Sequence, residues 1–362
     1  MKVGALARSV GPLVGLIFVW VLFAVLNGGS FVQWSNQRLM LTQTAVVGTA
    51  AIGATLIIIA GGIDLSVGST IALGTVVVGL LLDAGEPPLV AALGGIGAAM
   101  VCGLIIGTLV IGRLGGALTV IAGAILTGWL WARLGAPMPA AVGAGAVAAT
   151  GLALLVRRFD ARLPLAPFIV TLGMWGALRG LAKGLADNGQ VHPPDATWVG
   201  GLLDRATVLP TGVWMFLGLA LITGAALRYT RFGRHVYAIG SNEQTARLCG
   251  VRVERTKVWI YILGIGCAGL AALMQFSYLK AGDPTTAEGY ELKVIAAVVI
   301  GGASLSGGEG TIRGTIIGAL IMTVVDSGCT HLGIDNWVQE IVTGAMIVAA
   351  VALDRIRHRR AT

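Results

Sequence analysis

The sequence predicts an all-α integral membrane protein, a polytopic bundle of about 10–12 transmembrane helices forming a single transmembrane domain over residues 1–362. Of the 362 residues, 56% are apolar and 12% are charged, whereas soluble chains carry roughly 25% charge. Several apolar runs also approach the roughly 20 residues that a helix needs to cross a bilayer. Disorder, a secreted disulfide scaffold and an ordinary soluble enzyme all fit this composition poorly.

The apolar runs and the breaks between them divide the chain into twelve predicted helices. In order, these cover residues 10–27, 41–60, 67–82, 89–111, 117–133, 138–156, 167–186, 208–227, 258–279, 292–304, 314–331 and 337–353. The first run follows Lys2 and Arg8 without a small-residue cleavage site, so we interpret it as a retained helix. The other runs are separated by glycine, proline or charged residues, which commonly lie between helices. An even number of crossings places both termini on one side of the membrane.

The basic residues give the orientation. With the N-terminus inside, eighteen of the 25 lysines and arginines fall in inner segments, and seven of these lie in the loop 228–257. Cytoplasmic loops of membrane proteins are enriched in basic residues, so both termini are expected in the cytoplasm. The net charge of +8 then reflects topology, and no nucleic-acid partner is expected.

Glycine accounts for 55 residues, about twice its usual share of roughly 7%. Small residues let membrane helices approach closely, and Gly103-x-x-x-Gly107 and Gly314-x-x-x-Gly318 have the spacing for such contacts. The sequence contains no phosphate-binding loop and no metal or nucleophile–base motif. Its four cysteines and four histidines do not cluster. We therefore expect no catalytic site, no metal and no cofactor.

Two related strings follow predicted helices. The first is Gly61-Gly62-Ile63-Asp64-Leu65-Ser66-Val67-Gly68-Ser69. The second, Gly301-Gly302-Ala303-Ser304-Leu305-Ser306-Gly307-Gly308, keeps the pattern G-G-x-x-L-S-x-G. This recurrence indicates an internal repeat, which is common in transporters. Two interpretations of Asp64 remain open, namely a cap on the following helix and a direct role in the permeation path.

The basic loop 228–257 carries more than charge. Ser241 is placed to cap a helix of about two turns that would end at Gly250. Topology explains the excess of arginine here, but it does not explain the order of aromatic, glycine and helix signals between Thr230 and Val251.

Together these motifs resemble those of the membrane subunits of ribose/xylose-type sugar ABC importers. The resemblance runs from about residue 40 to the C-terminus, with the motifs in the family's order. It rests on the string 61–69, on Pro167-Phe168-Ile169-Val170-Thr171-Leu172-Gly173, on the loop 230–251 and on residues 296–310.

The resemblance implies a type II-like importer fold and a permease that is not itself an enzyme. Such a permease forms the translocation path for a monosaccharide in the bacterial inner membrane. The implied partners are a cytoplasmic ATPase that hydrolyses ATP, a periplasmic sugar-binding protein, the lipid bilayer and a second permease subunit, in a homodimer or a heterodimer.

The resemblance also assigns roles to residues. It implies that the ATPase-coupling part of the loop 228–257 comprises Phe232, Gly233, Arg234, Tyr237, Gly240, Asn242, Glu243, Ala246, Arg247 and Gly250. It implies that the signature near the pathway comprises Gly61, Gly62, Asp64, Leu65, Ser66, Gly68, Phe168, Thr171, Gly173, Gly301, Gly302, Ser306, Gly307 and Gly308.

The chain departs from the family pattern at residues 114–163, which hold two extra apolar segments. These are expected to form two additional crossings, with a re-entrant hairpin as the alternative. A stand-alone secondary transporter or channel for a small polar solute is the rival function, and a membrane anchor or assembly subunit is a third. Ionisable residues within the predicted spans are few, which counts against ion coupling.

Overall fold

The computed structural model describes residues 2–156, 163, 165–194, 197–204 and 208–359. Within these ranges all regular secondary structure is helical. The only β-type pairing among these residues is an isolated bridge between Val191 and Gly282. The prediction of an all-α protein is therefore confirmed. The end of the predicted insertion, residues 157–162, lies outside the described residues.

The helices are, in order, α1 (Lys2–Asn27), α2 (Gly29–Val32), α3 (Trp34–Ile59), α4 (Val67–Asp83), α5 (Pro88–Val110), α6 (Leu114–Leu134), α7 (Met138–Val156), α8 (Pro167–Leu185), α9 (Thr211–Tyr229), α10 (Arg231–Ser241), α11 (Glu243–Leu248), α12 (Val253–Leu279), α13 (Tyr290–Ile300), α14 (Ile312–His331) and α15 (Asn336–Arg359). Twelve of them coincide with the twelve predicted runs. The exceptions are α2, α10 and α11, which are short and join longer helices.

Within the described ranges, seven helices are long and apolar enough to cross a membrane, namely α3, α5, α6, α7, α9, α12 and α14. Shorter apolar stretches lie in α1, α4 and α15. The predicted crossing at 292–304 is wrong in its extent, because α13 has 11 residues. At a rise of 1.5 Å per residue it spans roughly 16 Å, about half of the hydrocarbon core. The non-helical segment 281–289 precedes it.

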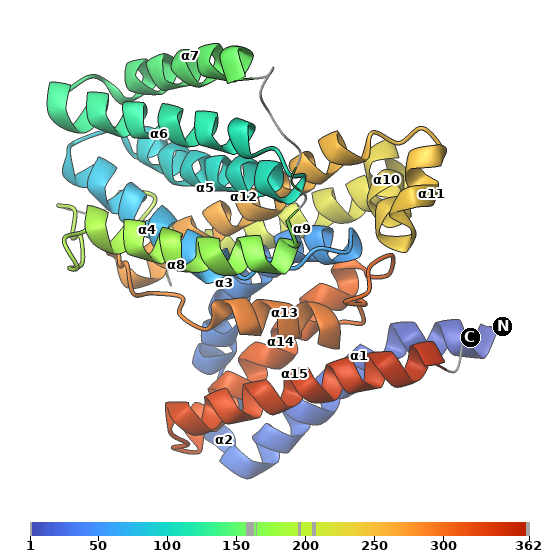
Figure 1. Cartoon of the computed structure of the whole chain (residues 1–362). Coiled ribbons are helices and arrows are strands. Elements are labelled where there is room, and N and C mark those ends of the chain that lie inside the picture. Colours follow the sequence, from blue (N-terminus) through green and yellow to red (C-terminus); the bar gives the residue numbers. More distant parts are fainter. Residues whose placement is uncertain (1, 157–162, 164, 195–196, 205–207, 360–362) are drawn as a thin grey trace.

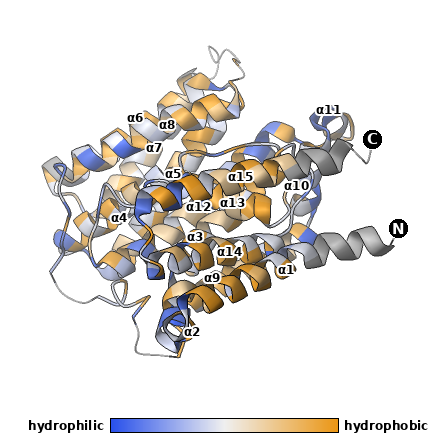
Figure 2. Cartoon of the chain, turned by 90° about the horizontal axis from the view of Figure 1, so that it is seen from below, coloured by the Kyte–Doolittle hydropathy of each residue, from blue (hydrophilic) through white to orange (hydrophobic). Residues whose placement is uncertain are grey.

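The helices pack in layers around α3 and α12 (Figure 1). On one side α12 packs against α5, which contacts α6, and α6 in turn contacts α7. On the other side α3 packs against α14, and α14 contacts α1 and α13. The longest helices are mostly apolar in colour, whereas α11 is hydrophilic (Figure 2). Both termini lie at the end of the bundle where α10 and α11 are found (Figure 1).

The two predicted close-packing motifs are confirmed. A Cβ at Gly103 would lie 2.6 Å from the carbonyl oxygen of Tyr261, so α5 touches α12 through its backbone. A Cβ at Gly314 or Gly318 would lie 2.0 or 1.9 Å from a carbonyl oxygen of the α13 end, at Gly301 or Ala297. These contacts show why glycine is so frequent in this chain.

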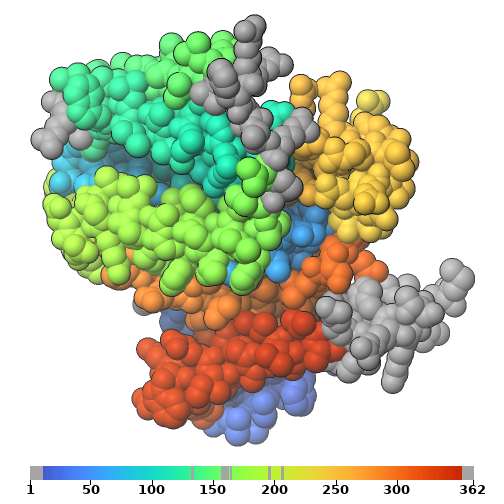
Figure 3. Space-filling model, in the orientation of Figure 1, coloured from blue at the N-terminus to red at the C-terminus, as the bar shows by residue number. Residues whose placement is uncertain are grey.

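The α6–α7 pair lies at the periphery of the bundle (Figure 3). Gly123 and Gly145 bring the two helices together, since a Cβ at either position would lie within 2.6 Å of the other residue's carbonyl oxygen. Among the described helices, α7 makes extensive contact with α6 alone. The pair is thus attached to the core through α5 and leaves most of its apolar surface exposed.

Candidate translocation site and coupling surface

The polar segment after α9 folds as two helices, α10 and α11. Thr230 caps α10, since its Oγ1 accepts a hydrogen bond from the Gly233 N–H at 3.2 Å. Asn242 caps α11, since its Oδ1 accepts from the Thr245 N–H at 2.8 Å. The expectation that Ser241 would be the cap is wrong, because Ser241 still belongs to α10. Gly250 follows α11 with φ of 83°, as the predicted helix stop requires.

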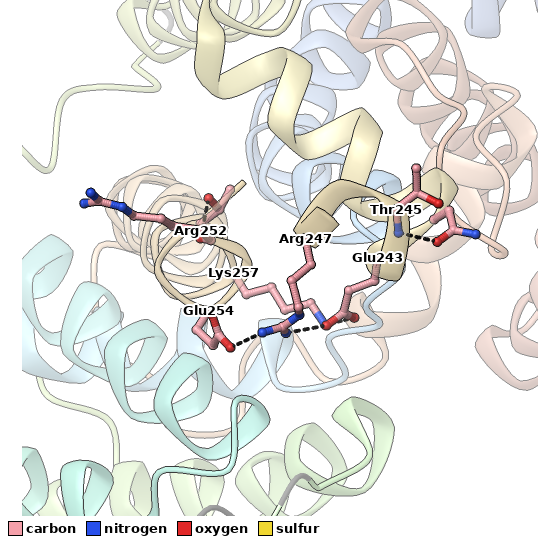
Figure 4. A network of polar contacts seen from close by, with 8 residues as sticks. Glu243, Thr245, Arg247, Arg252, Glu254 and Lys257 are labelled. Carbon is pink, nitrogen blue, oxygen red and sulfur yellow. Dashed lines mark hydrogen bonds and ion pairs between the residues drawn. The ribbon is translucent and has the colours of Figure 1, made fainter. Parts of the chain in front are cut away.

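An ion-pair network fastens α11 to the start of α12 (Figure 4). Arg247 pairs with Glu254 at 2.6 Å and with Glu243 at 3.4 Å, and Lys257 pairs with Glu243 at 2.6 Å. The hydrogen bond from Arg247 to Glu254 raises the pKa of Arg247 above its usual value. The side chains of Glu243 and Arg247 therefore hold α11 in place. They are also exposed, so a partner protein can contact them.

The inner face of α10 and α11 is buried against the rest of the chain. Gly233 and Ala246 are buried, and Phe232 packs against the main core. Tyr237 donates a hydrogen bond from its hydroxyl to the carbonyl oxygen of Gly310 at 2.8 Å, and burial raises the pKa of this tyrosine. Arg234, by contrast, is exposed. The predicted coupling residues thus divide between an inner attachment and an outer surface.

Gly240 is the point at which α10 joins the two repeated strings. A Cβ on Gly240 would lie 1.7 Å from the carbonyl oxygen of Ile59 and 2.6 Å from the backbone nitrogen of Gly308. The Gly308 N–H in turn donates to the Ile59 carbonyl oxygen at 2.8 Å. A Cβ on Gly307 would lie 2.8 Å from the Gly240 carbonyl oxygen and 3.0 Å from the Gly61 Cα. Three separate segments meet here backbone to backbone, and we call this contact the glycine joint.

The two strings fold into the same local turn. Asp64 Oδ1 accepts hydrogen bonds from the Ser66 backbone N–H at 2.8 Å and from the Ser66 hydroxyl at 2.6 Å. At the corresponding positions, the Ser306 backbone N–H donates to Ser304 Oγ at 3.3 Å. The Asp64 side chain closes this turn and does not cap the first turn of α4, whose N-cap residue is Ser66. The shared turn supports the internal repeat.

The remaining signature residues differ in their placement. Thr171 donates from Oγ1 to the carbonyl oxygen of Ile63 at 3.1 Å, so α8 is attached to the first string. Phe168 and Gly173 lie on the exposed side of α8 and do not join the glycine joint. A Cβ on Gly68 would lie 2.4 Å from Glu291 Oε2, which brings the start of α4 against the start of α13. Gly61 after α3 and Gly302 after α13 both have a positive φ, the left-handed conformation that favours glycine.

Sequence reasoning missed the segment 281–289, which runs as non-helical backbone beside α4. Arg179 of α8 donates from Nη1 to the carbonyl oxygens of Pro284 and Thr286 at 2.9 and 2.6 Å. Asp283 accepts from Gln190 Nε2 at 3.0 Å. Irregular backbone at membrane depth is tolerated only where protein surrounds it or where it lines a cavity. The sequence does carry one signal for this segment. The apolar run that follows it, 292–304, has only 13 residues, which is too short to cross the membrane alone and indicates that non-helical backbone completes the crossing.

A pocket of about 510 Å³ with a mixed polar and apolar lining lies at the other end of α3 from the glycine joint. Its walls include Trp34, Arg38, Asp204, Tyr278 and Lys280. Lys280 pairs with Asp204 at 2.6 Å. The pocket combines aromatic and charged side chains within the usual size range of small-molecule sites.

The fold and these contacts define a multi-pass membrane permease in which a polar helix pair is attached to breaks in the membrane helices. A family model described as "Branched-chain amino acid transport system / permease component" matches residues 38–113 and 113–351. The chain belongs to this family. No solved structure matches the chain at a significant level.

Individual relatives place the chain within the family. It is 33% identical over 350 residues to the ribose import permease of Bacillus subtilis, covering 96% of this chain and 93% of that protein. It is 33% identical over 347 residues to the ribose import permease of Escherichia coli K12, covering 94% and 92%. It is 31% identical over 354 residues to the fructose import permease of Rhizobium meliloti, covering 95% and 84%. The resemblance inferred from the motifs is confirmed: the chain is a permease component of an ABC import system and carries no catalytic domain.

Proposed function

We propose that this chain forms the translocation path for a monosaccharide that a periplasmic binding protein delivers and that a separate cytoplasmic ATPase drives. The relatives that support this are import permeases for ribose and fructose. The observation that carries the proposal is the glycine joint, because it connects a surface helix pair directly to the end of α3 and to the loop between α13 and α14. Movement imposed on α10 would displace Ile59 and Gly308 without an intervening side chain.

The ATPase would dock on α10 and α11, within the coupling loop 228–257. These helices project from the bundle (Figure 3) and expose Leu248 at 88% of its surface. With this end in the cytoplasm, both termini are cytoplasmic as well, in a bacterial inner membrane. The 510 Å³ pocket at the opposite end of α3 then faces the periplasm, where the binding protein would release its sugar.

A second permease subunit would pack against the exposed side of α8. Gly176, Gly180 and Gly184 recur at four-residue spacing, and among the described residues no other helix has an atom within 4 Å of a Cβ built on any of them. Trp175 and Leu181 on the same helix are exposed. Exposed glycines at this spacing allow another membrane helix to approach closely.

The residues 114–163 constitute, in this proposal, an inserted pair of crossings within a single transmembrane domain. Both α6 and α7 contain an apolar stretch of 18 residues, long enough for a membrane crossing. Their peripheral position leaves the glycine joint untouched.

The test is reconstitution of the chain with its ATPase and binding protein in proteoliposomes. We expect uptake of at least one radiolabelled monosaccharide that requires ATP and the binding protein. The buried carboxylate of Asp64 gives the rival secondary transporter a specific basis, since intramembrane carboxylates often couple ions. Uptake that ignores ATP and follows an ion gradient would establish that rival instead.

A further inference from the structure

Four buried polar atoms on the first string, α8, α12 and α13 have no hydrogen-bond partner among the described residues. They are Asp64 Oδ2, Arg179 Nη2, Tyr261 OH and Glu291 Oε2. The Tyr261 hydroxyl lies 2.7 Å from a Cβ built on Gly62, and Glu291 Oε2 borders Gly68, so both side chains lie beside the string that carries Asp64. Arg179 is hydrogen-bonded to Thr286, five residues before Glu291, and interacts electrostatically with Glu291. Asp64 and Tyr261 are each 3% exposed. We call these four residues the polar cluster.

Tyr261 and Glu291 lie inward from the end of the bundle that carries α10 and α11. Tyr261 is eight residues into α12 from Val253, and Glu291 is nine residues from the end of α13 at Ile300. At 1.5 Å per residue, both lie roughly 12–14 Å from the end of the bundle that carries α10 and α11. Part of that distance lies outside the hydrocarbon core, because Val253 belongs to the loop 228–257, so the cluster lies in the half of the bilayer nearer α10 and α11.

Unpartnered polar atoms at such a depth are costly. A buried donor or acceptor without a partner loses the hydrogen bonds it would make in water, about 1–3 kcal/mol for each group. Buried polar atoms normally have partners, and ionisable residues within a membrane generally mark substrate or ion pathways. The cluster therefore favours an occupant that supplies the hydrogen bonds which the described residues do not make.

The hydrogen-bonding groups select the kind of occupant. A monatomic cation cannot accept a hydrogen bond from the Arg179 guanidinium, and a simple anion cannot donate one to the carboxyl oxygens of Asp64 and Glu291. The free atoms comprise carboxylate acceptors, a guanidinium donor and a hydroxyl that can do either. A neutral molecule with several hydroxyl groups can both donate to the carboxylates and accept from Arg179 and Tyr261.

We propose that the polar cluster is an intramembrane binding site for a neutral polyhydroxyl molecule, namely the sugar in transit. This inference rests on the proposed function. In this structure the site is closed. Only one face of α8 is buried, and Thr171 and Arg179 attach the helix to backbone carbonyls of the two non-helical breaks. Displacement of α8 would open the cluster toward the exposed side of this helix.

The test uses Tyr261→Phe in the complete reconstituted complex, because this change removes only the unpartnered hydroxyl. At saturating binding protein, we expect the initial rate of ATP-dependent sugar uptake to fall about 5-fold or more, as for the loss of one hydrogen bond. The thermal midpoint of the purified variant should be unchanged or higher, because an unsatisfied buried hydroxyl has been removed. Thr150→Val removes a hydroxyl from the peripheral α7 and is the matched control, with uptake unchanged.

The outcomes separate the two proposals. If the wild-type complex takes up no monosaccharide in an ATP-dependent manner, the proposed function fails. If the wild-type complex transports and Tyr261→Phe transports equally well, water fills the cluster and the inference is wrong. A lower thermal midpoint for Tyr261→Phe would also overturn the inference, because the hydroxyl would then be structural.

Discussion

Leu163 donates its backbone N–H to the carbonyl oxygen of Gly112 at 3.0 Å, so the chain leaves the core at α6 and returns to the same place after α7. The family model also divides at residue 113. A segment whose two ends are hydrogen-bonded to each other can be removed without stretching the backbone that remains.

Deleting residues 114–162 should therefore leave an assembled permease. We expect its thermal midpoint to change by no more than a few degrees and its ATP-dependent uptake to stay within about 2-fold, because α7 packs on α6 alone among its described neighbours. Deleting residues 2–27 is the contrasting variant. It removes Phe23, which packs on Gly328 of α14, and should destabilise the protein. Loss of the folded protein on deletion of 114–162 would show that the pair is integral to the core.

The connection between α6 and α7 should be accessible from the side opposite α11. A cysteine introduced at Ala136 in a Cys249→Ser background is expected to react with a membrane-impermeant maleimide added from the periplasmic side. The other native cysteines, Cys102, Cys267 and Cys329, are buried and contribute little background. Labelling of residue 136 from the cytoplasmic side alone would contradict two full crossings.

Gly240→Ala should disrupt the glycine joint. The added Cβ would lie 1.7 Å from the Ile59 carbonyl oxygen, and backbone on both sides leaves no side chain to move aside. We expect a loss of stability of about 2 kcal/mol or more, or loss of coupled transport if α10 shifts to relieve the clash. Gly218→Ala in α9 is the control, since nothing lies within 4 Å of a Cβ there. Equal stability and equal uptake for the two variants would show that the close backbone contact at Gly240 is not needed for folding or transport.

Leu248 should contribute more to ATPase binding than the charged residues of α11. The Glu243–Arg247 pair is substantially exposed, and such pairs contribute about 0.2–1 kcal/mol. Burying Leu248 in a partner would contribute about 1.5 kcal/mol or more, so Leu248→Ser should weaken association at least about 10-fold. Glu243→Ala and Arg247→Ala should each weaken it less and leave membrane insertion intact.

Co-purification with the ATPase measures these effects, and Cys249 provides an independent readout. It is exposed beside Leu248, so the bound ATPase should slow its reaction with maleimide. Unchanged reactivity together with unchanged co-purification of Leu248→Ser would place the docking surface elsewhere.

The positions of the helices could be predicted because apolar runs of membrane length are local signals. Gly240, Gly61 and Gly308 were also found from their motifs, although their mutual contact was not foreseen. The cap of α11 was missed by one residue because Ser241 and Asn242 are both good N-cap residues, and composition alone does not choose between them.

The polar cluster could not be predicted in the same way. Arg179 lies within α8 and Glu291 at the start of α13, on helices far apart in sequence, and neither residue alone indicates a shared site. Asp283 and Pro284 read as an ordinary surface turn, because nothing local indicates that this stretch follows α4 into the membrane layer. Tertiary packing determines that course, through the Arg179 hydrogen bonds to two carbonyls and the contact of Gly68 with Glu291.

The glycine joint has a mechanical consequence. Side chains between two helices can change rotamer and absorb part of a displacement, whereas a carbonyl oxygen held against an α-carbon has no such compliance. A push on α10 would therefore reach the end of α3 and the loop before α14 at the same moment and with little loss of amplitude. Gly240 therefore transmits displacement between rigid backbone segments, and a methyl group added there would block their close contact.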